Sequence, residues 1–492
     1  MLAKQALLIS ALLPLIQGQD TSSETVLGVY VFHRHGDRTA KAHAPTVLTD
    51  LGYAQAFASG NYYRQRYIDS NATSPLYKIS SDIAKPSQLN VQAPADAVLQ
   101  NSAAGFLQGL YPPVGATLGS QTLANGTSVE APLGGFQLIP VNTVATASSS
   151  ANSENSAWLQ GSSGCDNAVT SSNNYFYSEE YMKLLNSTKG FYQSILPVIN
   201  TTFDATQTTF KNAYTIYDYV HVSTIHNSTI QSDDLLTNET LSQLLELANI
   251  HEFNLAYNAT DSIRAIAGST LAAQILQQLN TTITTHSSTP LTLQFGAYAS
   301  FLSFFGLAGL STLSPTFTTI VKYASSMTFE LITNYTLTPT SLYPPPTAIS
   351  VRFSFSNGSA AESPLVPYPL FGQAELEIPW TTFVSEMSRF AVGGEEEWCR
   401  VCGGEGPGGV CAAFTSEGPG SGSEGSGNEG TGKTDGISKA VAGAIGAMVM
   451  LGVVVGCEAL VLVGAGLRVV RKRRGGSVEG ADVGGQLGGK QA

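Results

Sequence analysis

The chain has 492 residues, of which 43% are hydrophobic and only 12% are charged. The chain is longer than a single compact core of ordinary size accommodates, so we expect two packed lobes with appendages. Acidic residues outnumber basic ones by 36 to 24, which argues against a nucleic-acid-binding protein, and the low charge with 49 glycines excludes a coiled coil.

The chain begins with the pattern of a secretory signal peptide. Residues 1–19 carry one early positive charge at Lys4, then an apolar run from Ala6 to Ile16, then small or polar residues. This pattern predicts a signal peptide over 1–19. The alternative, an N-terminal anchor or a buried helix, is disfavoured as an anchor because the run is too short to span a bilayer.

The folded part begins with a predicted buried strand over Val26–Phe32, a short run of apolar and β-branched residues. A helix is predicted to begin at Thr49, because a capping residue there precedes apolar positions three and four apart. Leu291–Phe295 predicts another buried strand. Between about 146 and 261 the chain is rich in Ser, Asn and Thr, with helix-like segments such as Ser242–Ile250. Together these patterns predict an α/β core that carries a mainly helical insertion.

Two histidines and two arginines follow the first predicted strand, in the order His33, Arg34, His35 and Arg38. Ligands usually bind at the carboxyl ends of strands in open α/β sheets. Guanidinium groups hold phosphoryl oxygens in a bidentate fork, and a neutral imidazole can attack phosphorus. Gly36 allows the backbone to come close to a phosphate. The stretch therefore predicts an anion site that contains its own nucleophile.

Each histidine also has a simpler interpretation, as an ordinary buried histidine beside solvated arginines. We favour that interpretation for His33. For His35, the surrounding sequence favours the role of nucleophile.

This motif is part of a longer pattern that resembles the histidine acid phosphatases, which belong to the histidine phosphatase superfamily with phytases and phosphoglycerate mutases. The resemblance spans about 24–400 and follows the order of that family. The stretches that carry it are His33–Arg38, Leu48–Gln55, Tyr63–Tyr67, Ser102–Ala103, Phe106–Pro112, Tyr323–Leu331 and Val351–Asn357.

The resemblance implies a phosphoglycerate-mutase-like core sheet with helices on both faces, formed by about 24–145 and 262–400, and a helical cap over about 146–261. It implies that His35 accepts the phosphoryl group while Arg34 and Arg38 hold the phosphate. The implied activity is that of an acid phosphatase, a phosphoric monoester hydrolase that acts on a phosphorylated small molecule and uses neither a metal ion nor another cofactor.

Two departures from the family pattern concern catalytic positions. The family has a third phosphate-binding Arg where this chain has Val98. It also has a His-Asp pair, whose Asp protonates the leaving group, where this chain has Ala297 and Tyr298. Asp96 is the closest acid to the first gap, but we do not expect it to act as the proton donor. Losing a positioned acid typically costs about 10²–10⁴-fold in rate.

Sequons and cysteines agree with secretion. We predict N-glycosylation at ten positions in the region before 358: Asn71, Asn125, Asn186, Asn200, Asn227, Asn238, Asn258, Asn280, Asn334 and Asn357. Four cysteines precede the predicted membrane span and are enough for two disulfides of open connectivity: Cys165, Cys399, Cys402 and Cys411. The Cys399–Cys402 spacing could indicate a redox or metal motif, but outside the cell a structural disulfide is favoured.

The C-terminal part predicts a membrane anchor. Residues 403–436 are rich in Gly, Ser and Glu, which predicts a flexible stalk that follows an ectodomain over 24–402. An apolar run over 438–467, interrupted by Glu458 and followed by a basic tail over 468–492, predicts one transmembrane helix with its basic side in the cytoplasm. A cleaved lipid-anchor signal fits less well, because such signals end on the apolar tail. The expected location is the cell surface, as a single-pass type I protein.

Two functions from different classes follow. The first is an extracytoplasmic acid phosphomonoesterase that acts through a phosphohistidine. The alternative is a weakened or inactive relative, a membrane-tethered glycoprotein that binds phosphorylated ligands. The intact motif at His35 favours the first, whereas the changes at Val98, Ala297 and Tyr298 favour the second. A mutase or phosphotransfer role is disfavoured in a secreted chain, and the sequence predicts neither the substrate nor the oligomeric state.

Overall fold

The computed structural model of the chain describes residues 24–144, 164–228, 230, 232–337, 342–404, 411–412 and 414. The predicted signal peptide, the predicted membrane span, the basic tail and most of the predicted stalk lie outside these residues. Within the described ranges, no helix combines the length and the apolar character that crossing a membrane requires.

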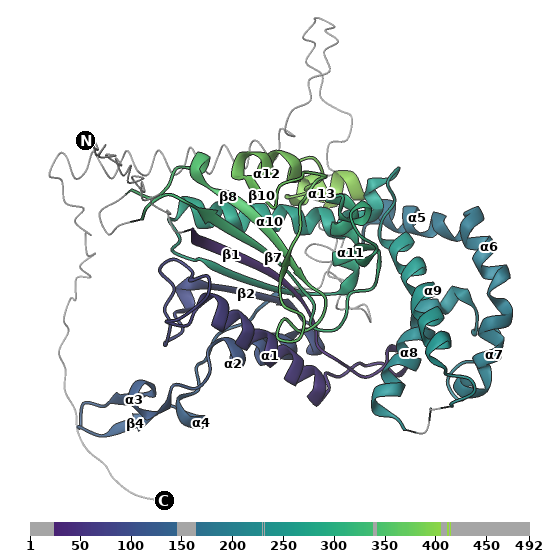
Figure 1. The fold of residues 1–492 in the computed structure, drawn as a ribbon, viewed down its shortest axis with the longest axis horizontal. Helices are drawn as coiled ribbons and strands as arrows, with labels where there is room; N and C mark the ends of the chain where they lie inside the picture. The colour runs from purple at the N-terminus through teal and green to yellow at the C-terminus, as the bar shows by residue number, and fades with distance from the viewer. Residues whose placement is uncertain are drawn as a thin grey trace, which may run out of the picture. The chain divides into compact units, whose positions relative to one another are not determined.

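An eight-stranded mixed sheet forms the centre of the fold (Figure 1). Its order is β10-β8-β7-β1-β6-β2-β5, and β9 pairs with β8. The first strand, β1, lies between β6, which is parallel to it, and β7, which is antiparallel. The strands of this sheet are β1 (Thr25–Arg34), β2 (Leu89–Pro94), β5 (Asn142–Val144), β6 (Leu291–Gly296), β7 (Ser326–Thr333), β8 (Ser350–Ser356), β9 (Val366–Pro367) and β10 (Glu377–Pro379). A small hairpin joins β3 (Ser120–Thr122) to β4 (Ser128–Glu130).

Helices cover both faces of the sheet (Figure 1). On β1, Tyr30 and Phe32 belong to one hydrophobic cluster, and Val29 and Val31 to another. This alternation follows from the two-residue period of a strand. The first cluster includes residues of α10 (Ile266–Thr284), α11 (Tyr298–Leu307) and α12 (Trp380–Met387). The second includes residues of α1 (Asp50–Tyr67) and α2 (Ala97–Leu110). The predicted α/β class is therefore confirmed, as are the strands predicted over Val26–Phe32 and Leu291–Phe295.

A mainly helical segment lies between β5 and β6 in the chain, and we call its helices α5–α9 the cap helices. They pack around a cluster of their own that includes Tyr192, Ile195 and Val220. The cap helices are α5 (Asp166–Asn174), α6 (Glu179–Ser187), α7 (Lys189–Ile199), α8 (Ala213–His226) and α9 (Asn238–Ala256).

The remaining helices are short. The α-helices are α3 (Gly115–Gly119), α4 (Pro132–Gly135) and α13 (Glu395–Cys402). The 3₁₀ turns are η1 (Lys41–His43), η2 (Pro86–Gln88), η3 (Tyr175–Tyr177), η4 (Phe210–Asn212), η5 (Ser262–Ala265), η6 (Leu310–Thr312), η7 (Pro315–Thr318) and η8 (Pro346–Ala348).

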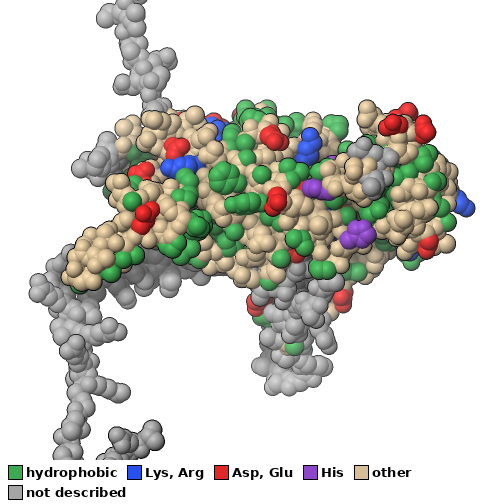
Figure 2. Space-filling view, turned by 90° about the horizontal axis from the view of Figure 1, so that it is seen from below, with side chains coloured by type: hydrophobic (Ala, Val, Ile, Leu, Met, Phe, Trp, Pro, Cys, Tyr) green, Lys and Arg blue, Asp and Glu red, His purple; other side chains and the backbone are tan. Residues whose placement is uncertain are grey.

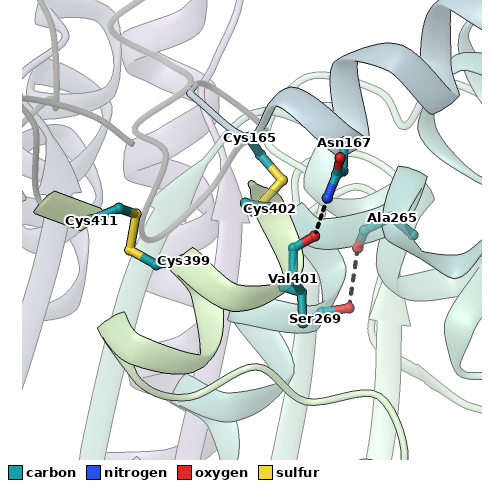
Figure 3. Close-up of a disulfide and its surroundings, with 8 residues drawn as sticks. All are labelled: Cys165, Asn167, Ala265, Ser269, Cys399, Val401, Cys402 and Cys411. Carbon is teal, nitrogen blue, oxygen red and sulfur yellow. Dashed lines mark hydrogen bonds between the residues drawn. A yellow bond between two sulfur atoms is a disulfide. The ribbon is translucent and has the colours of Figure 1, made fainter. Parts of the chain in front are cut away.

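The four cysteines form two disulfides, Cys165–Cys402 and Cys399–Cys411 (Figure 3). Two disulfides are therefore confirmed, although the two cysteines of α13 bond to other partners and not to each other. Cys165 immediately precedes α5, so the first bond ties the start of the cap helices to α13. The second bond ties α13 to a residue inside the range predicted for the stalk.

Basic side chains are sparse on the visible surface. On the face drawn in Figure 2, Lys and Arg are few and lie scattered among uncharged side chains. That face shows no continuous basic area.

Candidate functional site

The predicted site lies at the carboxyl end of β1. Arg34 is the last residue of β1, and residues 34–38 form a loop that leads toward η1. Arg34 pairs in register with Gly296, the last residue of the parallel strand β6. The two strands therefore end side by side, and Ala297 begins the segment that follows β6 at the same edge of the sheet.

Close packing against the start of α1 fixes the conformation of this loop. A Cβ at Gly36 would lie 2.1 Å from the carbonyl oxygen of Gly52, and a Cβ at Gly52 would lie 2.0 Å from the carbonyl oxygen of Asp37. The sequence interpretation assigned Gly36 to close approach of a phosphate. The structure gives a different reason, which is that two backbones meet where no side chain fits. Thr49 caps α1 as predicted and accepts a hydrogen bond from the Gly52 amide at 3.1 Å.

The His35 imidazole is completely buried. Its Nδ1 lies 2.7 Å from the carbonyl oxygen of Gly36. Because a carbonyl can only accept, Nδ1 must carry the proton, and Nε2 then keeps its lone pair in the neutral ring. The ring centroid lies 5.6 Å from that of Tyr323. The protonation pattern is the one that a histidine nucleophile attacking through Nε2 requires.

The guanidinium of Arg34 lies between two tyrosine rings. Its central carbon is 4.6 Å from the ring centroid of Tyr323 and 5.3 Å from that of Tyr298, distances typical of cation–π contacts. Its Nη1 donates to the carbonyl oxygen of Val321. The side chain is 4% exposed and lines a cavity, so a phosphate there would meet a largely desolvated cation.

The guanidinium of Arg38 is held by the carboxylate of Asp218 on α8. Nη2 donates to Oδ1 at 2.9 Å, and Nη1 donates to Oδ2 at 3.2 Å. Nη2 also donates to the hydroxyl of Tyr214 at 3.2 Å. Both side chains of the ion pair are almost fully buried, at 0% for Arg38 and 3% for Asp218. The second predicted phosphate-binding arginine therefore already has an internal carboxylate as a bidentate partner.

The third charged position of the loop, Asp37, also pairs with the cap helices. Its Oδ1 lies 2.6 Å from Nε2 of His226 at the end of α8, and Thr49 donates to the same oxygen at 2.5 Å. Two consecutive contacts, at positions 37 and 38, thus connect the loop to α8.

His33 is a buried structural residue, as the sequence favoured. It is 1% exposed, and its ring packs against Phe106 and Phe295 at centroid distances of 5.1 and 5.3 Å. Burial lowers its pKa to about 4, against a smaller opposing effect of the hydrogen bond with the carbonyl of Arg34. His33 is therefore neutral at neutral pH.

The three departures from the family pattern lie beside the loop. Val98 is buried in the first turn of α2, and its carbonyl accepts from the hydroxyl of Ser102 at 2.7 Å. The same hydroxyl accepts from the amide of Gly36 at 3.2 Å. Ala297 and Tyr298 follow β6 next to Arg34. Asp96 accepts from the amide of Leu99 at 3.0 Å and caps α2, which is a structural role.

Tyr298 is a poor replacement for an acidic proton donor. Its hydroxyl donates to Oε2 of Glu252 on α9 at 2.5 Å, and burial, followed by the charge of Glu252, raises its pKa well above the usual value. A general acid works best with a pKa near the working pH. This phenol keeps its proton far too tightly for that role.

A cavity of about 760 Å³ opens beside the loop. Residues of the loop, of α8 and α9, and of the segments before β7 and after β8 line it. Sequence reasoning did not identify four further residues at the site, three from the cap helices and one aromatic residue from the core: Asp218, His221, His226 and Tyr323. The described residues contain no cluster of three or more His, Cys, Asp or Glu side chains arranged to hold a metal ion.

A comparison with protein families matches a large part of the chain. The family model described as "Histidine phosphatase superfamily (branch 2)" matches residues 42–356, more than half of the chain. The match begins after the loop 34–38, so it is independent of the motif there. A comparison with curated proteins by sequence gave no match.

Solved structures similar to this chain include phosphatases from three bacteria. Hafnia alvei phytase in complex with tartrate has 12% identity and a TM-score of 0.46, with 75% of this chain and 98% of that chain covered. Klebsiella sp. ASR1 phytase has 11% identity and a TM-score of 0.49, with 76% and 97% covered. Bifidobacterium longum multiple inositol polyphosphate phosphatase in complex with inositol hexasulfate has 12% identity and a TM-score of 0.46, with 76% and 96% covered.

Proposed function

Since this chain belongs to the histidine phosphatase superfamily, branch 2, we propose that it hydrolyses phosphate monoesters through a phosphoryl group carried on His35. The observation that carries the proposal is that His35, with its Nδ1 held on the carbonyl of Gly36, and the buried Arg34 are neighbours at the end of β1, where Arg34 lines a cavity of about 760 Å³.

In the proposed reaction, Nε2 of His35 attacks phosphorus and the bond from phosphorus to the ester oxygen breaks. The Nδ1–H group stays on the carbonyl of Gly36 and keeps the ring in the reactive tautomer. Arg34 balances charge on the phosphoryl oxygens. The alcohol leaves with a proton, and water then attacks the phosphohistidine to release inorganic phosphate and return the neutral ring.

Turnover in this proposal is slow and favours acid pH. Ala297 carries no proton donor, and Tyr298 holds its proton too tightly, so the alcoholate leaving group depends on protonation from solvent. Acid conditions favour that protonation. Val98 supplies no charge, and Asp218 offsets the charge of Arg38, so Arg34 is the main cation for the transition state.

Specific contacts also favour the second candidate, a glycoprotein that binds phosphorylated ligands without turning them over. Asp218 on Arg38 and Glu252 on Tyr298 occupy two positions at which a phosphatase of this family would engage substrate. Both carboxylates come from the cap helices, so the cap supplies acidic side chains that contact Arg38 and Tyr298.

We also propose that the protein is extracytoplasmic, a single-pass type I glycoprotein of the cell surface. Two disulfides support an oxidising compartment. Seven of the ten predicted glycosylation sites are exposed and the other three, Asn258, Asn280 and Asn357, are half-buried. The test is an epitope at the C-terminus, which should be protected from protease in sealed cells while the ectodomain carries endoglycosidase-sensitive glycans. A tag that is cleaved from outside would contradict this orientation.

The test of activity compares wild type with His35→Ala on an aryl phosphate between pH 3 and pH 7. Activity should rise toward acid pH and disappear in the variant, and rapid quenching at neutral or alkaline pH should trap acid-labile phosphate on the peptide that contains His35. The exposed His43 on η1 provides a control, since His43→Ala should leave activity and trapping unchanged. Label on a Ser or Asp would refute the mechanism. A folded wild type with no turnover would favour the second candidate.

A further inference from the structure

The cavity beside the loop 34–38 contains a buried cation with an unused donor. Arg34 is 4% exposed, and among the described residues its Nε has no hydrogen-bond partner. A guanidinium N–H that is buried and unpaired favours a ligand oxygen that carries negative charge. The cavity volume of about 760 Å³ leaves room for much more than a phosphate ion.

The charges around this cavity do not favour a ligand with several phosphates. The described lining, counted together with the Arg38 that pairs with Asp218, contains three cations and three anions: Arg34, Arg38, Lys322, Asp37, Asp218 and Glu362. His221 also lines the cavity, and burial, the largest effect, lowers the pKa of its imidazole and favours the neutral ring. A phosphate monoester carries nearly two negative charges at neutral pH. A second phosphate in this cavity would therefore meet no excess of cations to balance it.

Aromatic rings continue from the guanidinium along the cavity. The ring of His221 lies between those of Tyr217 and Tyr323, at centroid distances of 5.3 and 6.2 Å and interplanar angles of 12° and 27°. The guanidinium of Arg34 lies 4.6 Å from the Tyr323 centroid. A phosphoryl group held by Arg34 would therefore have flat apolar surfaces directly beside it.

Aliphatic side chains form one part of the remaining wall, next to uncharged polar side chains such as Thr224, Ser242 and Asn249. The aliphatic side chains come from α8 and α9 on the cap side and from the segment before β7 on the core side: Val220, Ile225, Leu241, Leu245 and Ile320. The aliphatic part of the wall contributes affinity for groups that leave water readily, and it offers no hydrogen bonds to a polyol.

We propose that this cavity accepts a monoester with a single phosphoryl group and an apolar alkyl or aryl alcohol portion. The proposal rests on the proposed function, since it names the substrate class of the same site. Arg34 binds the phosphoryl group, the tyrosine and histidine rings contact the first part of the alcohol, and Leu241 and Leu245 contact its far end.

The test uses alkylphosphonates, whose carbon–phosphorus bond is not hydrolysed by this chemistry, so that wild-type protein is measured without turnover. Calorimetric titration with butyl-, hexyl- and octylphosphonate below their micelle concentrations should show the Kd falling about twofold to fourfold for each added methylene. myo-Inositol hexakis-sulphate, a non-hydrolysable polyanion, should bind no more tightly than butylphosphonate.

Two leucines of α9 provide a matched pair of variants. Leu245→Gln, in the cavity wall, should flatten the dependence on chain length, whereas Leu255→Gln, half-buried on the same helix but outside the cavity lining, should leave it unchanged. Arg34→Gln should weaken all three phosphonates by a similar factor. Equal Kd values for the three phosphonates, tighter binding of the polyanion, or no binding of any phosphonate would each overturn the proposal. Hydrolysis of an aryl phosphate is measured separately, so failure of catalysis and failure of this ligand assignment give different results.

Discussion

The carboxylate of Asp218 and the guanidinium of Arg38 form a two-point ion pair across 180 residues of sequence, with oxygen–nitrogen distances of 2.9 and 3.2 Å. The carboxylate also accepts the backbone N–H of Lys41 at 2.7 Å. A carboxylate and a phosphate present oxygens to guanidinium in the same way. We therefore expect Asp218 to compete with a substrate phosphate for Arg38.

We expect Asp218→Asn to make phosphate binding tighter while it destabilises the unliganded fold. Removing one partner of a buried ion pair costs about 3–5 kcal/mol, whereas a charge-assisted hydrogen bond from Arg38 to phosphate contributes about 1.5–3 kcal/mol. The variant should melt earlier than wild type without ligand, and its Kd for inorganic phosphate should be about tenfold lower. Thermal melts with and without phosphate, together with titration calorimetry, measure both effects.

Glu330 provides the control for this variant. It is a buried carboxylate that pairs with Arg66 and Arg352 at 2.9 and 2.6 Å and does not line the cavity. Glu330→Gln should destabilise the fold without changing the affinity for phosphate. If Asp218→Asn binds phosphate no better than wild type, Arg38 is a structural residue and the competition described above does not exist.

The stability of the core should fall in acid because of His33. Its folded pKa is lowered to about 4 by burial, whereas an exposed histidine in the unfolded chain titrates near 6.5. Between these values the unfolded state binds the proton and the folded state does not, so the free energy of unfolding decreases as pH falls from about 6.5 to about 4. The total loss is about 3 kcal/mol. Urea unfolding at several pH values should show this dependence of the free energy of unfolding on pH.

His33→Gln should remove that part of the pH dependence, since the amide does not titrate, although its buried surroundings make the variant less stable overall. His43→Gln, at an exposed histidine, is the comparison and should retain the slope of wild type. An unchanged slope in His33→Gln would mean that other groups cause the acid sensitivity. This effect opposes acid catalysis, so activity should pass through a maximum and then fall as the protein unfolds.

Local sequence patterns predicted the elements that carry the candidate site. The strand before His35 and the helix that begins after Thr49 follow from apolar periodicity and capping, which depend on neighbouring residues alone. Ala297 and Tyr298 were identified from the family resemblance, directly after a second predicted strand, and the parallel pairing of β1 with β6 places them at the end of β1.

The contribution of the cap helices could not be predicted. Composition indicated that the insertion is helical, but nothing local determines that Asp218 meets Arg38, that His226 meets Asp37, or that Glu252 accepts from Tyr298. These contacts depend on how α8 and α9 close over the loop, which long-range packing decides. The pairing of four cysteines was open for the same reason.

The Cys165–Cys402 disulfide should stabilise the fold more than Cys399–Cys411 does. The first closes a loop of 237 residues and the second a loop of 12. In the loop-entropy description, this difference amounts to about 2–3 kcal/mol in the free energy of unfolding. The paired variants Cys165→Ser/Cys402→Ser and Cys399→Ser/Cys411→Ser, compared by chemical denaturation under non-reducing conditions, measure it. Equal losses would show that strain or residual structure in the unfolded chain outweighs the loop length.

The most direct test of the catalytic argument restores the three missing side chains. In the triple variant Val98→Arg, Ala297→His, Tyr298→Asp, the third guanidinium and the His-Asp pair would stand beside the loop 34–38, because position 98 is one turn before Ser102 and positions 297–298 follow β6. A restored general acid should raise turnover about 10²-fold or more, and the added Arg should contribute a comparable electrostatic effect.

New charge at buried positions destabilises a fold unless it is paired or solvated, and Tyr298→Asp also leaves Glu252 without its phenol partner. In the triple variant the carboxylates at positions 298 and 252 would repel each other. Adding Glu252→Gln removes this repulsion, so turnover can be measured in the quadruple variant if the triple variant unfolds too early. In either variant, adding His35→Ala should abolish the gain in turnover, since the restored acid and the added arginine act on a phosphoryl group that His35 must accept. A folded variant that gains nothing, or a wild type that already turns over quickly, would show that another group donates the proton, and its pKa should then appear in the pH–rate profile.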